Sequence, residues 1–255
     1  MNKADIHVAE DIFGPDIGSL KGKTVRRNTG HIEDASPSTL PPEVINNYKQ
    51  MTICADIMFI NKITFLVTIS RHIRFGTCEA LISQSHYNIS NALENVMRLY
   101  ETSGFQVKRI HMDGQFEGIQ DKFTAKRQVP WINITSRDEH VPEAERYIRT
   151  IKERVRCVYN TLPFNKLPAR MTAEMAYSAV FWLNSFPNQN GISKSISPRR
   201  MVTGQDISYK RHCTLAFGSY AQVHEKHNND MAIQTTGAIA LRPTGNTQGG
   251  HYFLV

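Results

Sequence analysis

The sequence predicts an α/β fold in which a mixed β-sheet is flanked by helices and followed by a small β-rich C-terminal part. Three short apolar segments joined by tight turns come first, and helical and strand segments then alternate as far as a long helix that begins at Pro142. Strands that alternate with helices are typical of sheets that contain parallel strands. A hydrophobic fraction of 40% in 255 residues is sufficient for a normal globular core.

Three parts are expected along the chain: a lead-in or linker at 1–44, a core at 45–205 and a β-rich C-terminal segment at 206–255. The lead-in carries Gly14-Pro15 and the cluster Ser36-Pro37-Ser38-Thr39-Leu40-Pro41-Pro42, which mark turns and linkers. Residues beyond 215 alternate in polarity between Gly and Pro, which indicates short strands and a small barrel. We interpret this last segment as truncated and the chain as a piece of a longer polyprotein.

The first strands are expected at 52–60, 63–70 and 73–79, with Asn61-Lys62 as the first turn. Residues 90–100 are predicted to form an amphipathic helix, because their apolar residues recur at helical spacing. Further strands are expected at 107–112 and 131–135. The apolar residues on one face of the helix are Leu93, Val96, Met97 and Tyr100.

Pro142 is suited to the first turn of the next helix, where its missing N–H removes no hydrogen bond. That helix is expected to reach about residue 162, and a second helix, apolar nearly all round, is expected at 172–186. Residues 188–198 are expected to form a loop. The buried stripe predicted for the first of these helices is Ile148, Ile151, Val155 and Val158.

Net charge and cysteine usage narrow the class of protein. A formal charge of +7 and a pI near 9.3 favour a polyanionic partner, although moderately basic soluble proteins are common. The apolar runs are too short for a membrane helix and the N-terminus lacks a signal-peptide pattern, so we expect a nuclear or cytoplasmic protein that is not secreted. The cysteines are widely spaced and are expected to be small buried hydrophobes in a reducing compartment: Cys54, Cys78, Cys157 and Cys213.

Three acidic residues stand in contexts that suit chemistry. Asp56 interrupts an apolar strand, Asp113 ends the run 106–113 and precedes Gly114, and Glu145 lies in the first turn of the helix after Pro142. A carboxylate in an apolar strand is costly to bury unless a cation or hydrogen bonds compensate it. Three such groups can converge on hard cations such as Mg²⁺, which prefer oxygen ligands.

Each acid also has an ordinary explanation. Asp56 fits an edge-strand carboxylate paired with Lys or Arg, Asp113 fits a turn residue before glycine, and Glu145 fits a first-turn charge that complements the helix dipole. Glu143 is a rival for the third position, but it faces about 200° away from Glu145 on an ideal helix. The other nearby acids are Glu117 and Glu139.

The acids lie within a series of motifs that resembles the integrase core of copia-type retrotransposons, over about residues 45–225. The second acid belongs to Met112-Asp113-Gly114-Gln115-Phe116-Glu117, similar to the family's Asp-x-Gly-x-Glu-Phe. The third belongs to Glu145-Arg146-Tyr147-Ile148-Arg149-Thr150-Ile151-Lys152-Glu153. Two further matches follow: Ser197-Pro198-Arg199-Arg200-Met201-Val202-Thr203-Gly204 and Phe217-Gly218-Ser219-Tyr220-Ala221.

The resemblance implies a ribonuclease H-like sheet and metal-dependent polynucleotidyl transfer. In this family Asp56, Asp113 and Glu145 would be the catalytic residues and the ligands of two Mg²⁺ or Mn²⁺ ions. The reactions implied are 3′-end trimming and strand transfer in DNA integration. The implied partners are the DNA ends of the element, the target duplex and further copies of the chain in a homo-oligomer, with no membrane.

The sequence departs from the family in three places. The interval between Asp113 and Glu145 is a little short, an upstream module with paired His and paired Cys is missing, and the region after Phe217 is only loosely similar. Two alternatives therefore remain open. One is a decayed or domesticated copy that binds DNA without catalysis, and the other is a structural segment for multimer assembly.

Other residue patterns carry less information about function. Arg149, Lys152 and Arg156 share a helix face with Glu145 and are expected to contact DNA phosphates, unless the face is merely solvated. The segment 17–24 lacks the first glycine of a phosphate loop, and His224 and His227 are interpreted as surface residues. His111 is expected on the same side of its strand as Asp113, either as a neighbour of the site or as a core histidine.

Overall fold

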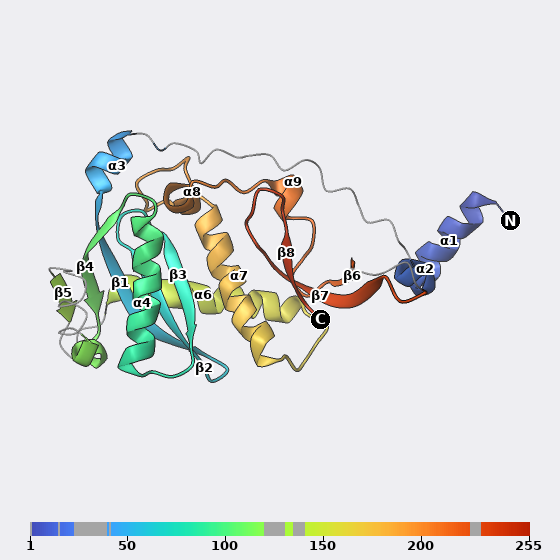
Figure 1. The fold of residues 1–255 in the computed structure, drawn as a ribbon, viewed down its shortest axis with the longest axis horizontal. Coiled ribbons are helices and arrows are strands. Elements are labelled where there is room, and N and C mark those ends of the chain that lie inside the picture. The colour runs from blue at the N-terminus through green and yellow to red at the C-terminus, as the bar shows by residue number, and fades with distance from the viewer. Residues whose placement is uncertain are drawn as a thin grey trace.

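The structure is a computed structural model that describes residues 2–14, 16–22, 40, 42–119, 141–224 and 231–255, together with the backbone of 131–134. Its centre is a five-stranded sheet with the strand order β3-β2-β1-β4-β5 (Figure 1). A three-stranded sheet, β6-β7-β8, forms the C-terminal part. The predicted fold class, a mixed α/β sheet flanked by helices with a small β-rich C-terminal part, is confirmed.

The first two strands form the antiparallel hairpin that the sequence predicts. β1 (Gln50–Ile60) and β2 (Ile63–Ser70) pair from Ile60↔Ile63 to Ile53↔Ser70. Asn61 and Lys62 both have positive φ, 47° and 66°, the conformation that two-residue hairpin turns require.

The third strand begins later than expected. β3 (Gly76–Leu81) pairs antiparallel with β2, whereas residues 71–75, part of which was predicted as strand, form a turn. Arg74 has φ 62°, and the Ser70 hydroxyl accepts a hydrogen bond from the Phe75 N–H at 3.0 Å. Ile73 and Phe75 are buried, so apolar character there reflects the core rather than a strand.

The sheet is mixed because its last two strands run parallel to β1. β4 (Gln106–Met112) pairs with β1, and β5 (Trp131–Ile134) pairs with β4. β4 is followed by a short 3₁₀ helix, Gly114–Phe116, that turns the chain away from the sheet. Parallel neighbours end at the same edge of a sheet, so residues that follow β1 and β4 are brought to one side of the molecule.

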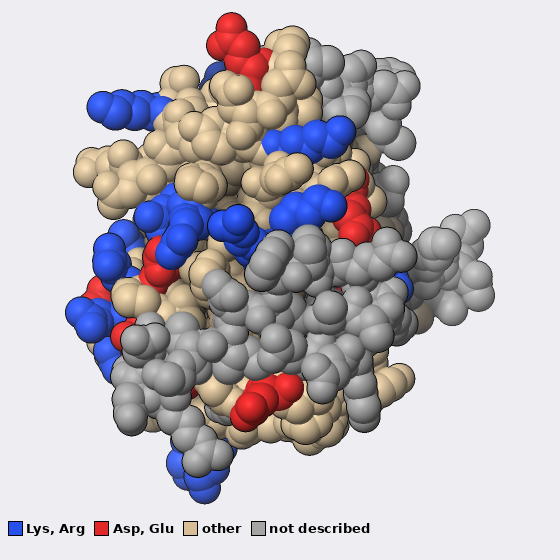
Figure 2. Space-filling model, turned by 90° about the vertical axis from the view of Figure 1, so that its left-hand side faces the viewer, with Lys and Arg blue, Asp and Glu red and all other residues tan. Residues whose placement is uncertain are grey.

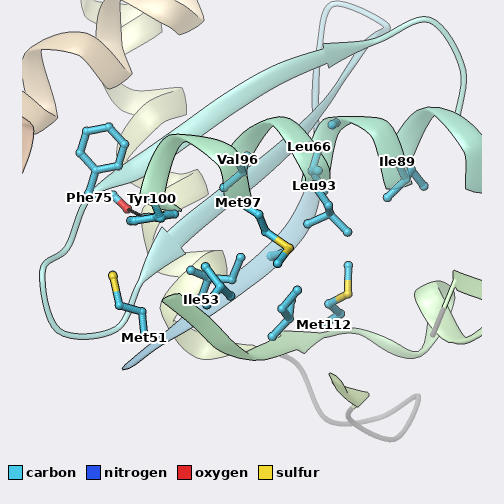
Figure 3. Close-up of a cluster of buried hydrophobic side chains, with 14 of the residues drawn as sticks. Met51, Ile53, Leu66, Phe75, Ile89, Leu93, Val96, Met97, Tyr100 and Met112 are labelled. Atoms are coloured by element: carbon cyan, nitrogen blue, oxygen red, sulfur yellow. Dashed lines mark hydrogen bonds between the residues drawn. The ribbon is translucent and has the colours of Figure 1, made fainter. Parts of the chain in front are cut away.

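One face of the sheet is covered by α4 (His86–Glu101), which begins four residues earlier than expected because the Ser85 hydroxyl caps it by accepting from the Asn88 N–H. Figure 3 shows its apolar side chains packed against those of the strands below. Tyr100, fully buried, donates a hydrogen bond to the Phe75 carbonyl at 3.1 Å. Members of this core are Met51, Ile53, Leu66, Leu93, Val96, Met97, Ile110 and Met112.

The opposite face is covered by α6 (Pro142–Thr161) and α7 (Ala169–Ser185). Figure 1 shows α6 crossing behind the sheet from the side of β4 and β5. Three of the four stripe residues predicted for α6 are buried, and Val158 is partly buried at the margin of the core. The β-strands contribute alternate residues to this second core: Cys54, Met58, Phe65, Val67, Ile69 and Cys78.

The C-terminal sheet consists of β6 (Tyr220–His224), β7 (Thr235–Pro243) and β8 (His251–Leu254), all antiparallel. It lies beside α7 (Figure 1). Two short helices precede it, α8 (Pro198–Thr203) and α9 (Tyr209–His212).

The N-terminal residues contain α1 (Lys3–Phe13), α2 (Ile17–Gly22) and α3 (Pro42–Tyr48). α2 and α3 contain no buried residue. α2 contacts the C-terminal sheet, since the carbonyl of Lys21 accepts a hydrogen bond from the Gln234 N–H at 2.8 Å.

Two of the four free cysteines are buried and two are exposed. Cys54 and Cys78 are buried as expected, but Cys157 and Cys213 are exposed, which corrects the prediction that all four are core residues. Cys157 lies on the outer flank of α6, and Cys213 follows α9, where neither sheet covers it. Within the described ranges, no helix combines the length and apolar character needed to cross a membrane.

Candidate active site

Asp56 and Asp113 lie on neighbouring parallel strands and share one face of the sheet. The β1–β4 register pairs Cys54 with His111. Asp56 and Asp113 each come two residues later, and Asp113 keeps an extended backbone with φ −75° and ψ 161°. Because side chains alternate between faces, both aspartates are on the side of Cys54, which belongs to the core under α6.

The carboxylate of each aspartate also accepts a hydrogen bond from the backbone N–H of the next residue. A carboxylate oxygen of Asp56 accepts a hydrogen bond from the Ile57 N–H at 2.6 Å, and one of Asp113 accepts from the Gly114 N–H at 2.7 Å. Asp113 caps the short 3₁₀ helix, as the turn interpretation of this residue expected. Both are half-buried, so each carboxylate retains access to solvent at the sheet surface.

The start of α6 separates the two candidate glutamates. Glu143 is half-buried and forms an ion pair with Arg71, whose Nε and Nη2 lie 2.9 and 2.8 Å from the carboxylate oxygen Oε1. Glu145 is exposed. The two lie about 200° apart around the helix axis, so they flank the buried stripe on opposite sides.

The flank that carries Glu143 faces the beginning of β1. Arg71 follows β2, and its N–H donates to the Thr52 carbonyl at 2.9 Å. Tyr147, one helical turn after Glu143, packs against Gly76 at the start of β3.

The flank that carries Glu145 faces the end of β1. Lys152 and Arg156, which share this flank, line a cavity of about 410 Å³ with Phe59, Ile60 and Asn61 at the β1–β2 turn. The carboxyl ends of β1 and β4 point the same way, so the β1–β2 turn beside this cavity lies at the end of the sheet where Asp113 follows β4.

The charges around β4 influence one another. Burial lowers the pKa of His111, and the nearby charge of Arg71 lowers it further against the opposing effect of Glu143. Burial alone would raise the pKa of Glu143, but the hydrogen bond and charge of Arg71 bring it below its usual value. Burial, with the Glu143 charge, raises the pKa of Cys54 to about 11, so this thiol is neutral at pH 7. His111 shares the face of Asp113, as expected, because two residues of extended chain separate them.

The three predicted site residues are placed on one side of the sheet, but their side chains are not gathered. Across the described ranges, no three His, Cys, Asp or Glu side chains are grouped closely enough to hold a metal ion. The structure therefore places Asp56 and Asp113 on one face of the sheet, and the role of all three carboxylates as ligands remains a prediction.

The basic face of α6 is accessible. Arg149 and Arg156 are exposed and Lys152 is half-buried. Figure 2, which views the molecule from the side of β4 and β5, shows Lys and Arg side chains grouped across the middle of this surface, with a few Asp and Glu beside them. Phosphate contacts by these three side chains stay a prediction.

The downstream motif has a structural explanation. Ser197 caps α8, since its hydroxyl accepts from the Arg200 N–H at 3.2 Å, and Gly204 ends the helix with φ 68°. The proline lies in the first turn, where it is tolerated. These residues specify a short helix rather than a site for chemistry.

The remaining candidates from the sequence lie in several parts of the chain. Glu117 is exposed, and His224 ends β6. Glu139 and His227 lie outside the described residues, as do the last two residues of the segment 17–24, whose first six form α2.

Sequence reasoning missed Arg71, the partner that holds Glu143. The pair is 72 residues apart along the chain. Arg71 lies in a turn whose local sequence carries no recognisable motif, so only the tertiary structure reveals the contact.

The comparisons with known proteins give similarity at the level of structure alone. No family model matches the chain, and no curated protein is similar to it in sequence. Among solved structures, the catalytic core domain of BIV integrase is similar with a TM-score of 0.42 and 15% identity, over 59% of this chain and 92% of that one.

Two structures of the HTLV-2 integrase catalytic core domain in complex with magnesium are also similar. The trimeric form has a TM-score of 0.44 and 15% identity over 59% of this chain and 95% of that one. The dimeric form has a TM-score of 0.42 and 14% identity over 59% and 94%.

Proposed function

We propose that this chain is the catalytic core of an integrase-type polynucleotidyl transferase from a copia-like retroelement. It would trim DNA 3′ ends and join them to a target duplex, acting as a homo-oligomer in the nucleus or cytoplasm. The motif order in the sequence supports this proposal. The observation that carries it is the β1–β4 register, which brings Asp56 level with Asp113 on the face that α6 covers.

The donor set fits hard divalent cations by its chemistry. Asp56, Asp113 and Glu145 offer carboxylate oxygens, the ligands that Mg²⁺ and Mn²⁺ prefer. Asp56 lies within β1 and Asp113 directly follows β4, and Glu145 is exposed in the first turn of α6. These three residues would hold the ions. When bound, the ions would activate the attacking oxygen and stabilise the leaving oxygen of the phosphoryl transfer.

The chain's own residues would position the DNA. Arg149, Lys152 and Arg156 extend along α6 from Glu145 and would hold backbone phosphates beside the reacting one, without reading sequence. The ion pair of Glu143 with Arg71 would fix the start of α6 over the sheet and thereby the direction of Glu145.

The proposal is tested by joining a labelled DNA end to a target duplex with purified protein and Mg²⁺ or Mn²⁺. The matched variant is Asp113→Asn, which keeps an oxygen for the Gly114 N–H but removes the charge that a metal ligand needs. Metal-dependent joining that is lost in the variant supports the mechanism. Joining that survives in Asp113→Asn overturns it.

A second candidate is a copy that retains the fold and binds DNA without catalysis. The observation that favours it is that the described carboxylates are not grouped as a metal site. Salt-sensitive DNA binding without joining in either metal would support this alternative. The integrase proposal also includes the division of the chain into a lead-in at 1–44, a catalytic core at 45–205 and a β-rich segment at 206–255.

A further inference from the structure

A cavity of about 330 Å³ lies at the opposite edge of the five-stranded sheet from the proposed active site. It is built where β3, the edge strand, meets α7, and it receives one arginine from α8 and one from β7. The cavity therefore lies between the core and the C-terminal sheet. Its polar or backbone-lined wall includes Gly76, Cys78, Tyr177, Asn184, Arg199 and Arg242.

The exposed edge of β3 is capped at two points. The Asn184 side chain accepts from the Gly76 N–H at 2.9 Å and donates to the Gly76 carbonyl at 2.7 Å, while the Ala80 N–H donates to the Tyr177 hydroxyl at 3.2 Å. Alternate residues of an edge strand direct their backbone groups to the same side. The backbone N–H of Cys78, midway between the capped positions, is therefore directed toward the cavity, which Cys78 lines.

The Arg199 guanidinium is held by several contacts, but one of its buried hydrogen-bond donors has no partner among the described residues. One of its terminal nitrogens donates to the Gly245 carbonyl at 3.1 Å and to Gln205 at 3.2 Å, and its guanidinium lies 4.8 Å from the centre of the Phe181 ring. Its Nε is buried and has no hydrogen-bond partner among the residues that the structure describes. A buried donor without a partner costs free energy that an acceptor in the cavity would recover.

A second guanidinium lies in the same cavity. Arg242 donates from Nε to Glu174 at 2.9 Å and stacks over Tyr252, with 4.4 Å to the ring centre. Burial lowers the pKa of Arg199, and the like charge of Arg242 lowers it further, so the two cations repel each other.

Carboxylates offset only part of this positive charge. Glu174 is buried and shared between Arg242 and Arg170, and Glu79 lies at the cavity wall. Burial raises the pKa of Glu79, against the opposing charge of Arg242. Arg199 itself has no carboxylate within ion-pair distance in the described part of the chain.

We infer that this cavity is a binding site for a phosphate group, held by Arg199, Arg242 and the backbone N–H of Cys78. A tetrahedral oxyanion can accept from a planar guanidinium and from a backbone N–H at once, and it would relieve the repulsion between the two cations. The phosphate belongs either to a free phosphate compound or to a nucleotide. The inference does not depend on the proposed DNA chemistry, because it uses the other edge of the sheet.

The test is titration of the purified full chain with inorganic phosphate, followed by calorimetry at constant ionic strength, with chloride as the reference anion. A parallel titration with a 5′-mononucleotide distinguishes the two sources, because tighter binding of the nucleotide assigns the phosphate to a nucleotide. We expect saturable binding that Arg199→Gln weakens about tenfold or more. The matched control is Arg200→Gln, which removes the next cation along α8, one that pairs with Asp206 at 3.1 Å.

Retention of the fold is checked by circular dichroism and by the melting temperature, which phosphate should raise in the wild type and Arg200→Gln but not in Arg199→Gln. If Arg199→Gln fails to fold, Arg199→Lys provides the same comparison, because lysine keeps the charge but loses the planar donors. Absence of saturable phosphate binding in the wild type would overturn the inference. Equal affinity in the wild type and the folded Arg199 variant would overturn it as well.

Discussion

The two flanks of α6 each begin with a glutamate, and the molecule uses the two residues differently. Glu143 is half-buried against Arg71 and faces the beginning of β1. Glu145 is exposed and shares its flank with Lys152 and Arg156, which face the end of β1. A carboxylate held by a guanidinium fixes the helix, whereas the role of the exposed Glu145 in chemistry is the proposal made above. A separation of two residues along a helix is sufficient to place the two glutamates in these different surroundings.

The largest expected effect tests directly whether Glu143 and Glu145 have different roles. Glu145→Gln should reduce metal-dependent DNA joining by on the order of 10³-fold, the scale seen when a group that stabilises transition-state charge is lost. Glu143→Gln should retain joining within about tenfold, because it affects only the position of the helix. Both rates are measured with the same labelled DNA end and with Mg²⁺ in excess.

The opposite pattern would reassign the third acid. If Glu143→Gln abolished joining and Glu145→Gln did not, the Arg71 ion pair would have to open to release Glu143 toward the aspartates. A thermal unfolding curve for each variant shows that the lost activity does not come from an unfolded chain.

The comparison also shows how far the sequence determines the molecule. The first hairpin could be predicted because its apolar runs and the Asn61-Lys62 turn are local features. The start of β3 could not, because Ile73 and Phe75 are apolar yet belong to a turn stabilised by the Ser70 hydroxyl. Burial was predicted correctly there, but the backbone conformation was not.

The candidate site divides in the same way. Asp56 was expected in mid-strand and Asp113 at the end of the adjacent strand, and the β1–β4 register places both on one face of the sheet. The choice of Glu145 over Glu143 rested on a motif and stays a prediction, and the structure adds only the contact of Glu143 with Arg71. Such a contact between distant segments has no local signal. The cavity lined by Arg199 and Arg242 could not be predicted for the same reason, because α8 and β7 come together only in the folded chain.

A second prediction sharpens the difference between the flanks through salt dependence. Replacing Arg149, Lys152 and Arg156 together by alanine should weaken binding of duplex DNA for all sequences alike. The slope of log K against log salt should become shallower by about 0.9 for each phosphate that the variant no longer neutralises. Binding is measured by fluorescence anisotropy over a series of salt concentrations.

The control for this prediction lies on the other flank. Arg154 lines a cavity between α6 and α7, and Arg154→Ala removes one positive charge from the same helix. We expect it to leave the slope unchanged, and the single variant Arg156→Ala provides the comparison at equal charge. Equal slopes for Arg154→Ala and Arg156→Ala would show that the basic face of α6 is merely solvated.

A smaller effect concerns the tyrosine on the flank of Glu143. The Tyr147 hydroxyl is buried and has no hydrogen-bond partner in the described part of the chain, and a buried polar group without a partner is destabilising. Tyr147→Phe should therefore raise the free energy of unfolding by up to about 1 kcal/mol. The measurement is urea unfolding followed by circular dichroism.

Tyr100→Phe is the matched control, because the Tyr100 hydroxyl is equally buried but donates to the Phe75 carbonyl. Its removal should lower the free energy of unfolding by about 1 kcal/mol. Two Tyr→Phe variants with opposite signs would confirm the contrast between a satisfied and an unsatisfied hydroxyl. A loss of stability in both would show that Tyr147 has an acceptor in solution.

The smallest effect is the pH dependence of the Glu143–Arg71 pair. Since Arg71 brings the pKa of Glu143 below its ordinary value of 4.5, ionised Glu143 stabilises the folded state. That contribution is complete above the ordinary pKa and is lost as the pH falls through the lower folded pKa. The pair is partly exposed, so the contribution is up to about 1 kcal/mol. The stability difference between wild type and Glu143→Gln should therefore shrink as the pH falls below 4.5.

Urea unfolding of both proteins between neutral pH and pH 3 measures this difference, and an NMR titration of the Glu143 carboxyl group locates its pKa. Arg71→Gln should move that pKa upward, because it removes the hydrogen bond and the charge while burial, which favours the neutral acid, remains. A stability difference that does not change with pH, or a Glu143 pKa that is the same in wild type and Arg71→Gln, would show that the ion pair does not form in solution. The start of α6 would then be fixed by its apolar stripe alone, and the two flanks would no longer differ in how their glutamates are held.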